Sequence, residues 1–322
     1  MILSVTINPL LERRFFFNGI NINGGNRATH QELRAGGKGI NISRQLNNLN
    51  INNHSFVFIG GKNGKLLREV LRQEKIEFTA FPTKSETRDG VVIVDEKSNK
   101  VTSYFGINSQ ITTEEAEAFK FKLEKMIMNC EIVVFSGSSP CTQADSIFPF
   151  GIERANKYNK ISVCDTYGRH LKKCIENSPT IVHNNITEVE ETFNISLKDE
   201  KSKLEYLDSL YKKNNIKQVY LTDDENPFYI SNFDYHFKII PPKIKKVDSL
   251  GSGDSFTAGI IYAWHNKLTF EEGLKIASAL GAVNAKRTDT SNVNFDEAQE
   301  LIDNIVVNSV GKKIIKLDVT PT

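Results

Sequence analysis

The chain contains 322 residues, and 41 lysine and arginine residues nearly balance 39 aspartate and glutamate residues, for a net charge of +2. Such a balance offers no clustered basic surface for a nucleic-acid backbone, and no apolar run approaches the roughly 18–20 residues that span a bilayer. The N-terminus lacks a signal-peptide pattern and the four cysteines lack the spacing of metal or redox motifs, so we expect a cytoplasmic protein that binds neither nucleic acid nor membrane.

Along the chain, short β-branched or apolar runs alternate with longer helical patterns, which is typical of βαβ units around a mostly parallel sheet. We expect strands at residues 3–7, 55–59, 132–135, 161–165, 180–183 and 218–222. Helices are expected at residues 113–128, 255–264 and 270–286, where apolar residues recur near helical spacing. The pattern predicts an α/β fold in which helices flank a mostly parallel central sheet.

Two segments interrupt this alternation, residues 10–33 and 87–105. Both combine β-forming residues with turn chemistry, at Gly24 and Gly25 in the first and at residues 95–99 in the second. We expect them to pair into one small sheet, a lid over the carboxyl edge of the main sheet, where open α/β folds bind ligands. The expected organisation is therefore an α/β core of residues 1–9, 34–86 and 106–322, with a β-sheet lid of residues 10–33 and 87–105.

Three glycine clusters are candidate ligand loops. In the cluster at 60–65, GGKNGK, only three residues separate Gly60 from Gly64 and Leu66 follows where a phosphate-binding P-loop needs Ser or Thr. We interpret it as a tight turn between a strand and a helix. No GxGxxG fingerprint occurs, which argues against a dinucleotide-dependent oxidoreductase.

The cluster at 35–41, AGGKGIN, precedes a helical pattern. Its glycines let the backbone approach a ligand closely at a helix start, while Lys38 and Asn41 supply a charge and an amide there. A plain loop-to-helix turn is the alternative interpretation.

The third cluster, at 248–255, reads DSLGSGDS and leads into a helix rich in small residues. Gly251, Ser252 and Gly253 can present successive backbone N–H groups as an anion nest at the helix N-terminus. A carboxylate beside such a nest would repel a bound phosphate, so Asp254 makes chemical sense as a general base that deprotonates an attacking hydroxyl. Alternatively, Asp254 is an N-cap residue.

The segments 36–41 and 248–254, in this order and at this separation, resemble the two signatures of the ribokinase-like (PfkB) sugar kinase family. Residues 136–140 (SGSSP), 165–168 (DTYG) and 185–188 (NITE) also resemble its motifs, so the resemblance extends over nearly the whole chain. Residues 8–13 (NPLLER), 26–27 and 86–88 look like the branch that acts on phosphorylated ketohexoses, of the 1-phosphofructokinase and tagatose-6-phosphate kinase type.

The resemblance implies a ribokinase-like three-layer fold and ATP-dependent transfer of a phosphoryl group to a fructose 1-phosphate or tagatose 6-phosphate class substrate, which gives a bisphosphate. It implies the following roles: Asp254 as base with Gly251, Ser252 and Gly253 as anion hole; Glu12, Arg27, Gly37, Lys38, Gly39, Asn41, Arg88 and Ser136 at the sugar phosphate; and Asn185, Glu188, Thr222, Asp224, Gly251, Gly253 and Asn284 at the nucleotide. Mg²⁺ is expected to bridge the ATP phosphates with only indirect help from Glu188. A homodimer that packs two lids together is expected, because open sheet edges invite pairing.

Four departures from the family pattern affect these expectations. Glu12 stands where the family usually has Asp, Gly90 where it often has Asn, and His183-Asn184 where it has Lys-Pro. The nucleotide turn at 222–228 has lost its glycines and carries three consecutive acids, which disfavours close approach of a polyphosphate.

Two alternatives therefore stay open. One is a kinase for a neutral sugar or nucleoside, with Arg27 and Arg88 merely structural. The other is a non-catalytic sugar-phosphate sensor with a degenerate nucleotide site. Fructose 1-phosphate, fructose 6-phosphate and tagatose 6-phosphate are all compatible with the kinase hypothesis.

Overall fold

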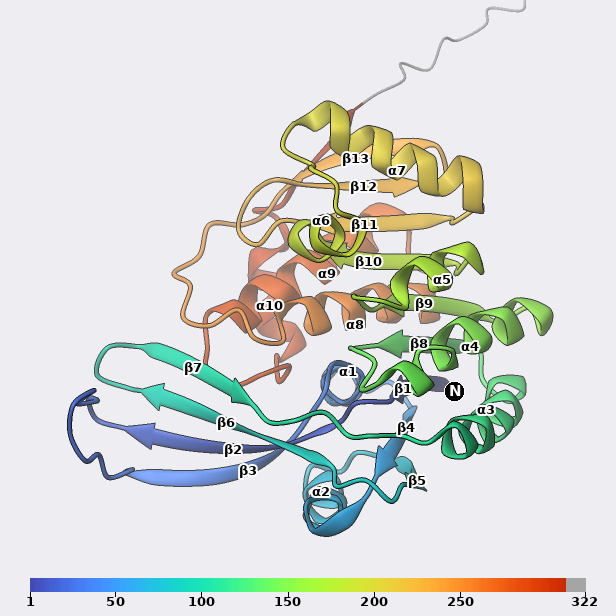
Figure 1. Ribbon diagram of the computed structural model, residues 1–322. Coiled ribbons are helices and arrows are strands. Elements are labelled where there is room, and N and C mark those ends of the chain that lie inside the picture. Colours follow the sequence, from blue (N-terminus) through green and yellow to red (C-terminus); the bar gives the residue numbers. More distant parts are fainter. Residues whose placement is uncertain (311–322) are drawn as a thin grey trace, which may run out of the picture.

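A large sheet organises the molecule (Figure 1), and the computed structural model describes residues 1–310, so that 311–322 of the expected core lie outside the described residues. The sheet has ten strands, in the spatial order β14 (Val306–Val310), β13 (Tyr235–Ile240), β12 (Phe228–Asn232), β11 (Gln218–Thr222), β10 (Ile181–Asn185), β9 (Ile161–Asp165), β8 (Ile132–Ser136), β1 (Ile2–Thr6), β4 (Asn53–Ile59) and β5 (Phe78–Pro82). The strands from β11 to β5 are parallel to one another, whereas β12, β13 and β14 form an antiparallel edge that the sequence pattern does not predict.

Helices cover both faces of this sheet, and alternate strand residues bury their side chains against opposite layers. Val133 and Phe135 of β8 belong to the hydrophobic cluster on one face, and Ile132 and Val134 to the cluster on the other. The first face carries α3 (Thr113–Met128), α4 (Ile147–Lys157), α5 (Leu171–Glu176), α6 (Ile186–Phe193) and α7 (Glu200–Asn214); the second carries α1 (Lys38–Asn48), α8 (Ser252–His265), α9 (Phe270–Ala285) and α10 (Phe295–Ile302). α2 (Gly61–Gln73) packs against β4 in a third cluster, and a 3₁₀ turn spans Thr142–Ala144.

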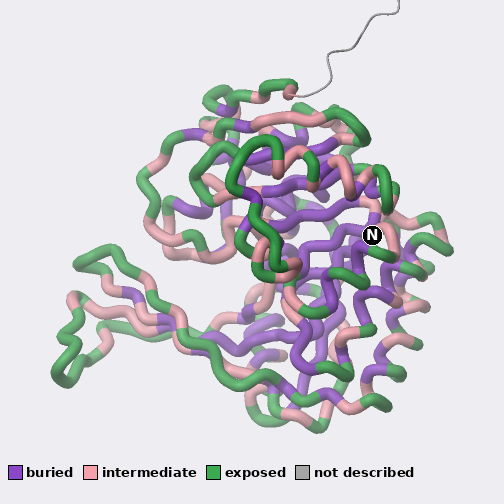
Figure 2. Tube along the Cα trace, turned by 45° about the horizontal axis from the view of Figure 1, so that its top comes forward, coloured by how far each residue is buried: buried purple, intermediate pink, exposed green. Residues whose placement is uncertain are grey.

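A separate sheet of four strands, called the small sheet below, projects from this body (Figure 2). Its order is β3 (His30–Gly36), β2 (Leu10–Phe17), β6 (Arg88–Asp95) and β7 (Lys100–Phe105). β2 and β6 pair in parallel, which confirms that the two distant segments form one sheet. β3 continues past the expected end at residue 33, because Gly36 still pairs with Leu10.

The local sequence explains where several elements begin. Thr112 and Glu115 form a capping box at the start of α3, and Thr269 and Glu272 form another at the start of α9. Gly60 precedes α2, which confirms the strand-to-helix turn expected there. α8 begins at Ser252 rather than at 255, so the glycine cluster is itself the first helical turn. None of the helices in residues 1–310 is long and apolar enough to cross a membrane.

Candidate active site

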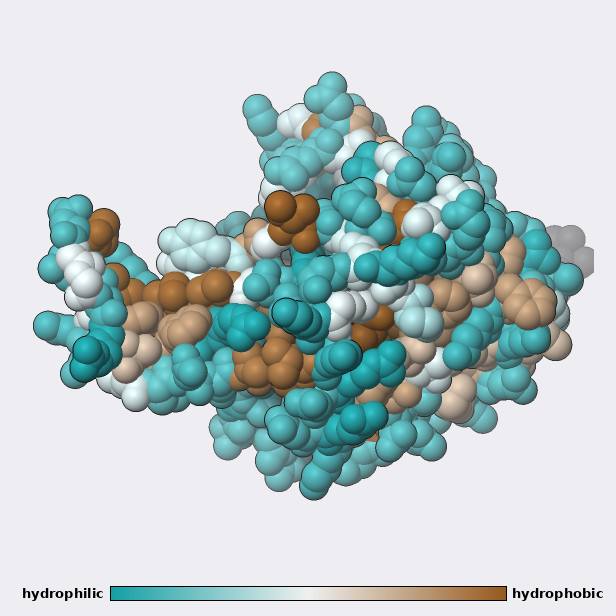
Figure 3. Space-filling model, turned by 60° about the horizontal axis from the view of Figure 1, so that its bottom comes forward, coloured by the Kyte–Doolittle hydropathy of each residue, from teal (hydrophilic) through white to brown (hydrophobic). Residues whose placement is uncertain are grey.

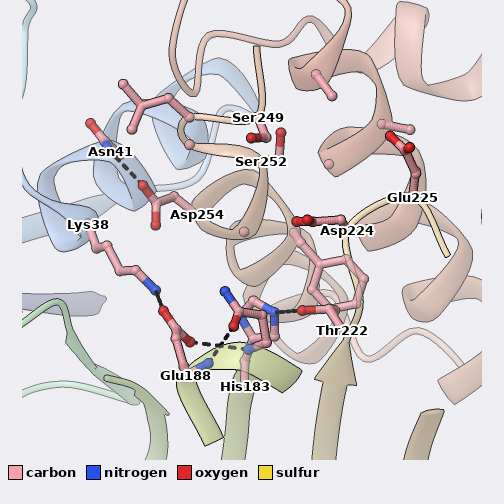
Figure 4. Close-up of a pocket in the computed structure, with 18 of the residues that line it drawn as sticks. Lys38, Asn41, His183, Glu188, Thr222, Asp224, Glu225, Ser249, Ser252 and Asp254 are labelled. Atoms are coloured by element: carbon pink, nitrogen blue, oxygen red, sulfur yellow. Dashed lines mark hydrogen bonds and ion pairs between the residues drawn. The ribbon is translucent and has the colours of Figure 1, made fainter. Parts of the chain in front are cut away.

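A cavity of about 470 Å³ opens at the carboxyl ends of β9, β10 and β11, beside the root of the small sheet. Most of the candidate residues line it: Glu12, Gly37, Lys38, Asn41, Arg88, Asn185, Glu188, Thr222, Asp224, Gly251, Ser252, Gly253 and Asp254. The glycine clusters at α1 and α8 thus meet across one cavity, although more than two hundred residues separate them (Figure 4). Asp254 faces this cavity instead of the packed interior.

The anion nest, residues 251–253, is the N-terminus of α8. Gly251 is the N-cap residue and adopts a left-handed conformation with φ of 78°, which glycine tolerates best. A side chain at Gly251 would collide with Thr290 and Ser291, so the turn that carries these two residues packs directly behind the nest. The first-turn amides of a helix have no intrahelical acceptors. The Ser252 amide donates to Ser249 O at 3.1 Å, so the amides of Gly251 and Gly253 are the ones that the nest can offer to an anion in the cavity.

Asp254 lies in the first turn of α8 and is only 4% exposed. Its Oδ2 accepts a hydrogen bond of 2.7 Å from Asn41 Nδ2, and Asn41 Oδ1 in turn accepts one of 2.8 Å from Arg44 Nη1. Because the helix N-cap is Gly251, the interpretation of Asp254 as an N-cap is wrong. Burial raises the pKa of Asp254 to about 7, while Lys38 and the Asn41 hydrogen bond oppose that increase.

Lys38 begins α1, directly after Gly37, whose φ of 118° permits the sharp entry into the helix. Its Nζ lies 3.0 Å from Asp165 Oδ1 and 3.1 Å from Glu188 Oε1. Burial lowers the pKa of Lys38, but the charges of Asp165, Glu188 and Asp254 outweigh it and hold that pKa well above its usual value. A positive charge therefore stands close to Asp254, the candidate base.

Asp165, at the end of β9, is the centre of the hydrogen-bond network and was not predicted as a site residue. It is fully buried and accepts hydrogen bonds of 3.2 Å from both Ser136 Oγ and Thr257 Oγ1. Burial raises the pKa of Asp165, but the charge of Lys38 and the contact with His183 lower it by more. The net pKa lies below its usual value, so Asp165 stays ionised. The sequence did contain a signal for Asp165, because it lies in the DTYG segment at the carboxyl end of an expected strand, where open α/β folds bind ligands.

Asn185 and Glu188 form a capping box at the start of α6, in which Asn185 Oδ1 accepts from the Glu188 amide at 2.7 Å. The neighbouring His183 forms part of the cavity wall. Its Nδ1 lies 2.9 Å from Thr257 Oγ1 and its Nε2 lies 3.2 Å from Thr222 Oγ1. An imidazole thus occupies the wall where the family pattern has a lysine.

The end of the cavity beyond Thr222 is apolar and acidic. Phe228, Pro241, Pro242 and Ile244 line it together with Asp224 and Glu225. Asp224 and Glu225 are exposed, and in Figure 4 they lie across the cavity from Asn41. The acidic turn therefore borders the candidate nucleotide end without closing it.

At the opposite end, Glu12 of β2 and Arg88 of β6 reach the cavity from the small sheet. Glu12 is 5% exposed and its Oε1 lies 3.1 Å from Arg14 Nε. Burial raises the pKa of Glu12, and the charge of Arg14 counteracts that effect. Arg88 donates to the backbone oxygen of Asn8 at 3.1 Å, which fixes one edge of its guanidinium.

Four expected site residues do not line the cavity. Arg27 is exposed in the loop between β2 and β3, and Gly39 is buried where α1 packs against Thr6 of β1. Ser136 is 1% exposed because its hydroxyl serves Asp165. Asn284 is fully buried and donates to Leu250 O at 2.8 Å and Ser252 Oγ at 3.1 Å, so it supports the nest from behind.

Comparisons with known proteins agree with this architecture. A tagatose-6-phosphate kinase of Staphylococcus epidermidis is 28% identical over 312 residues, which cover 96% of this chain and all of that protein. Phosphofructokinase-2 of Escherichia coli, solved in complex with substrates and products, superposes with a TM-score of 0.82 at 20% identity and covers 94% of this chain and 98% of its own. A Thermotoga maritima structure described as a possible 1-phosphofructokinase reaches a TM-score of 0.88 at 22% identity, over 96% of this chain and 99% of that chain.

The chain also matches the sequence model of a protein family. Residues 17–297 match the pfkB family of carbohydrate kinases, which is most of the chain. Within that match lie the α1 cluster, the anion nest and Asp254, the same parts that the structure brings together at one cavity. This chain is a phosphotransferase that belongs to the pfkB family of carbohydrate kinases.

Proposed function

We propose that this protein transfers the γ-phosphoryl group of ATP to a hydroxyl of a ketohexose monophosphate, of the fructose 1-phosphate or tagatose 6-phosphate class, and releases a bisphosphate and ADP. The observation that carries the proposal is the position of Asp254, which stands beside the anion nest in a cavity whose other end holds Glu12 and Arg88. The tagatose-6-phosphate kinase similarity supports the same substrate class.

In this mechanism the substrate hydroxyl gives its proton to Asp254 Oδ while its oxygen bonds to the γ-phosphorus, and the bond to the ADP oxygen breaks. A general base works best when its pKa is near the working pH, and burial raises the pKa of Asp254 to about 7. The nest amides of Gly251 and Gly253 stabilise the charge on the migrating group, while the Ser252 amide donates to Ser249 O. Lys38 adds a fixed positive charge beside it.

The far end of the cavity suits a nucleotide. Its apolar wall of Phe228, Pro241, Pro242 and Ile244 can contact a nucleotide base. Asn185 and Glu188 line the same cavity, and Glu188 pairs with Lys38. When Mg²⁺ is bound with the nucleotide, it neutralises charge on the β- and γ-phosphates. Residues 1–310 contain no cluster of three or more His, Cys, Asp or Glu side chains that could hold a metal ion, so we propose that Glu188 acts on Mg²⁺ indirectly.

The sugar end would use groups from both sheets. We propose that Glu12 accepts hydrogen bonds from sugar hydroxyls and that Asn41 donates a hydrogen bond to one. Arg88 would bind the substrate phosphate. The small sheet, whose strands lie within residues 10–36 and 88–105, would then serve as a lid over the α/β core and exclude water during transfer. Arg27 is exposed in one chain, so within a single chain Arg88 is the arginine that supports a phosphate clamp.

A coupled assay with ATP and Mg²⁺ tests the proposal directly. Turnover is compared on fructose 1-phosphate, fructose 6-phosphate, tagatose 6-phosphate, fructose and ribose. We expect a phosphorylated ketohexose to have the highest kcat/KM. Preference for a neutral sugar would contradict the phosphate clamp, and sugar-phosphate binding by calorimetry without ATP binding would favour a sensor.

We further propose that the protein forms a homodimer through the small sheet. Phe15, Phe17, Val91 and Ile93 lie on one face of this sheet and are only half buried, and apolar side chains run along its surface (Figure 3). Exposed apolar faces of this kind mark protein interfaces. Sedimentation should give a dimer for the wild-type protein and a monomer for Ile93→Lys, whereas a wild-type monomer would refute the interface.

A further inference from the structure

Alternating charges cover the face of the small sheet that is turned toward the body of the protein. Across the β2–β3 ladder, Glu12 stands opposite Arg34, and Arg14 stands opposite Glu32. Each positive charge therefore has a negative neighbour on the next strand, which favours this register. Arg14 is the most buried of the four, with 1% of its side chain exposed.

Arg14 pairs with Glu32, whose Oε1 lies 3.8 Å from its Nη1, and makes two closer contacts that point in different directions. Its Nε lies 3.1 Å from Glu12 Oε1, at the sugar end of the cavity. Its Nη2 donates a hydrogen bond of 2.7 Å to the backbone oxygen of Thr288, in the turn that follows α9. Arg34 pairs with Asp289 of the same turn, so the small sheet is tied to this turn twice.

The turn at 288–291 leads onward to the anion nest. Ser291 Oγ donates to Gly251 O at 3.1 Å, and the Ser291 amide donates to Asn284 Oδ1 at 2.6 Å. Thr290 and Ser291 fill the space behind Gly251, where no side chain would fit. A continuous series of contacts therefore connects Glu12, through Arg14 and this turn, with the backbone of the nest.

We propose that Arg14 is a positioning residue that couples the sugar end of the cavity to the anion nest. It holds the Glu12 carboxylate in place and anchors the 288–291 turn that supports Gly251. Losing one member of a buried ion pair leaves the other with less compensation. Without Arg14, the Glu12 carboxylate would lose the contact that orients it and the largest of the three positive charges that oppose its protonation. The inference deepens the proposed function and rests on it.

The arginine next to it on the same strand provides a matched control. Arg13 points to the opposite face of β2, and its contacts are long, 4.0 Å to Asp89 and 3.5 Å to Asn63. It has no contact with Glu12 or with the 288–291 turn among residues 1–310.

The experiment compares Arg14→Met, Arg14→Lys and Arg13→Met by steady-state kinetics and thermal unfolding. For Arg14→Met we expect about a 10- to 100-fold rise in KM for the sugar substrate and a similar fall in kcat, the effect of losing a close ion pair together with a charge-assisted hydrogen bond to a backbone oxygen. KM for ATP should change by less than about threefold, since the ATP end keeps its contacts. Arg14→Lys should recover part of the sugar KM but not kcat, because one ammonium cannot reach Glu12 and Thr288 together. Arg13→Met should match the wild-type protein.

A separate variant tests the connection to the nest. Ser291→Ala removes the hydrogen bond to Gly251 O and should lower kcat without raising the sugar KM. In the double variant Arg14→Met/Ser291→Ala, the loss of kcat should be smaller than the product of the two single losses, because both act through one turn. Fully multiplicative losses would overturn the coupling.

Other outcomes are equally decisive. Equal increases in the KM values of sugar and ATP, or lower thermal stability with unchanged kinetics, would make Arg14 merely structural. If Arg14→Met does not fold, Arg14→Lys alone decides, and wild-type kinetics in that variant would refute the proposal. If the wild-type protein acts on a neutral sugar, the proposed substrate fails, and the same Arg14 comparison is made with that sugar.

Discussion

The anion nest and the nucleotide end of the cavity differ in how firmly their charged side chains are held. At the nest, Asp254 is bound by Asn41, which Arg44 holds in turn, and Lys38 lies between Asp165 and Glu188. At the nucleotide end, Asp224 and Glu225 are exposed, and the nearest partner of Glu225 is Lys246 at 3.6 Å.

This difference fits what the proposed function requires of each part. Groups that act on developing charge gain most when they are already oriented, because no reorganisation is then needed during the reaction. A turn that only borders the nucleotide carries no such requirement, and solvent screens its charges. Substitutions should therefore have effects that decrease from the nest toward the acidic turn.

The largest effect is expected for Asp254→Asn. Loss of the general base should lower kcat by about 10²- to 10⁴-fold, while the KM values of both substrates stay within about threefold of the wild type. Steady-state kinetics measure both, with Asp234→Asn in the exposed β12–β13 turn as the control. Near-normal turnover would remove Asp254 from the mechanism.

The next effect concerns Lys38 and pH. In the wild-type protein kcat/KM should fall as the pH drops below about 7, because Asp254 then takes up a proton. Lys38 lowers the pKa of Asp254, so Lys38→Met should move this acidic limb to higher pH and reduce kcat by about tenfold or more. A pH–rate profile measures the shift, and Lys62→Met at the exposed start of α2 is the control. A limb that stays in place or moves to lower pH would contradict the assigned base.

A comparison of the two arginines tests the sugar end. Arg88→Met should raise KM for the phosphorylated substrate by about 10- to 100-fold, because a charge-assisted hydrogen bond to phosphate is lost. If each chain acts alone, Arg27→Met should leave that KM within about twofold, as expected for an exposed surface charge. An equally large effect at Arg27 would mean that each chain does not act alone and that Arg27 contacts a substrate only in an assembly of chains.

The smallest effect is expected at the acidic turn. Removing the charges with Asp224→Asn and Glu225→Gln should lower KM for ATP by about two- to threefold, since exposed charges interact weakly in water. The change should shrink further at high salt, which an ionic-strength series would reveal. A higher KM for ATP would instead mean that these carboxylates bind the nucleotide.

Much of this architecture was predictable from local sequence. Alternating strand and helix patterns predicted the parallel sheet, and the segments 35–41 and 248–255 indicated both ligand loops. Local turn chemistry also predicted the small sheet, because residues 95–99 favour a hairpin whatever lies around them. The edge strands β12, β13 and β14 escaped prediction because strand propensity depends on neighbours that are distant in sequence.

The sequence alone therefore determined the order of elements, the nest with its adjacent carboxylate and the membership of one kinase family. Only the tertiary structure decided which polar side chains reach the cavity. Asp165 became the centre of the network, Asn284 and Ser136 turned into supports behind the wall, and Arg14 joined two ends of the site. The reason is physical: a residue's type and spacing set its chemistry and its local conformation, but its partners come from strands and turns brought together by packing of the whole chain.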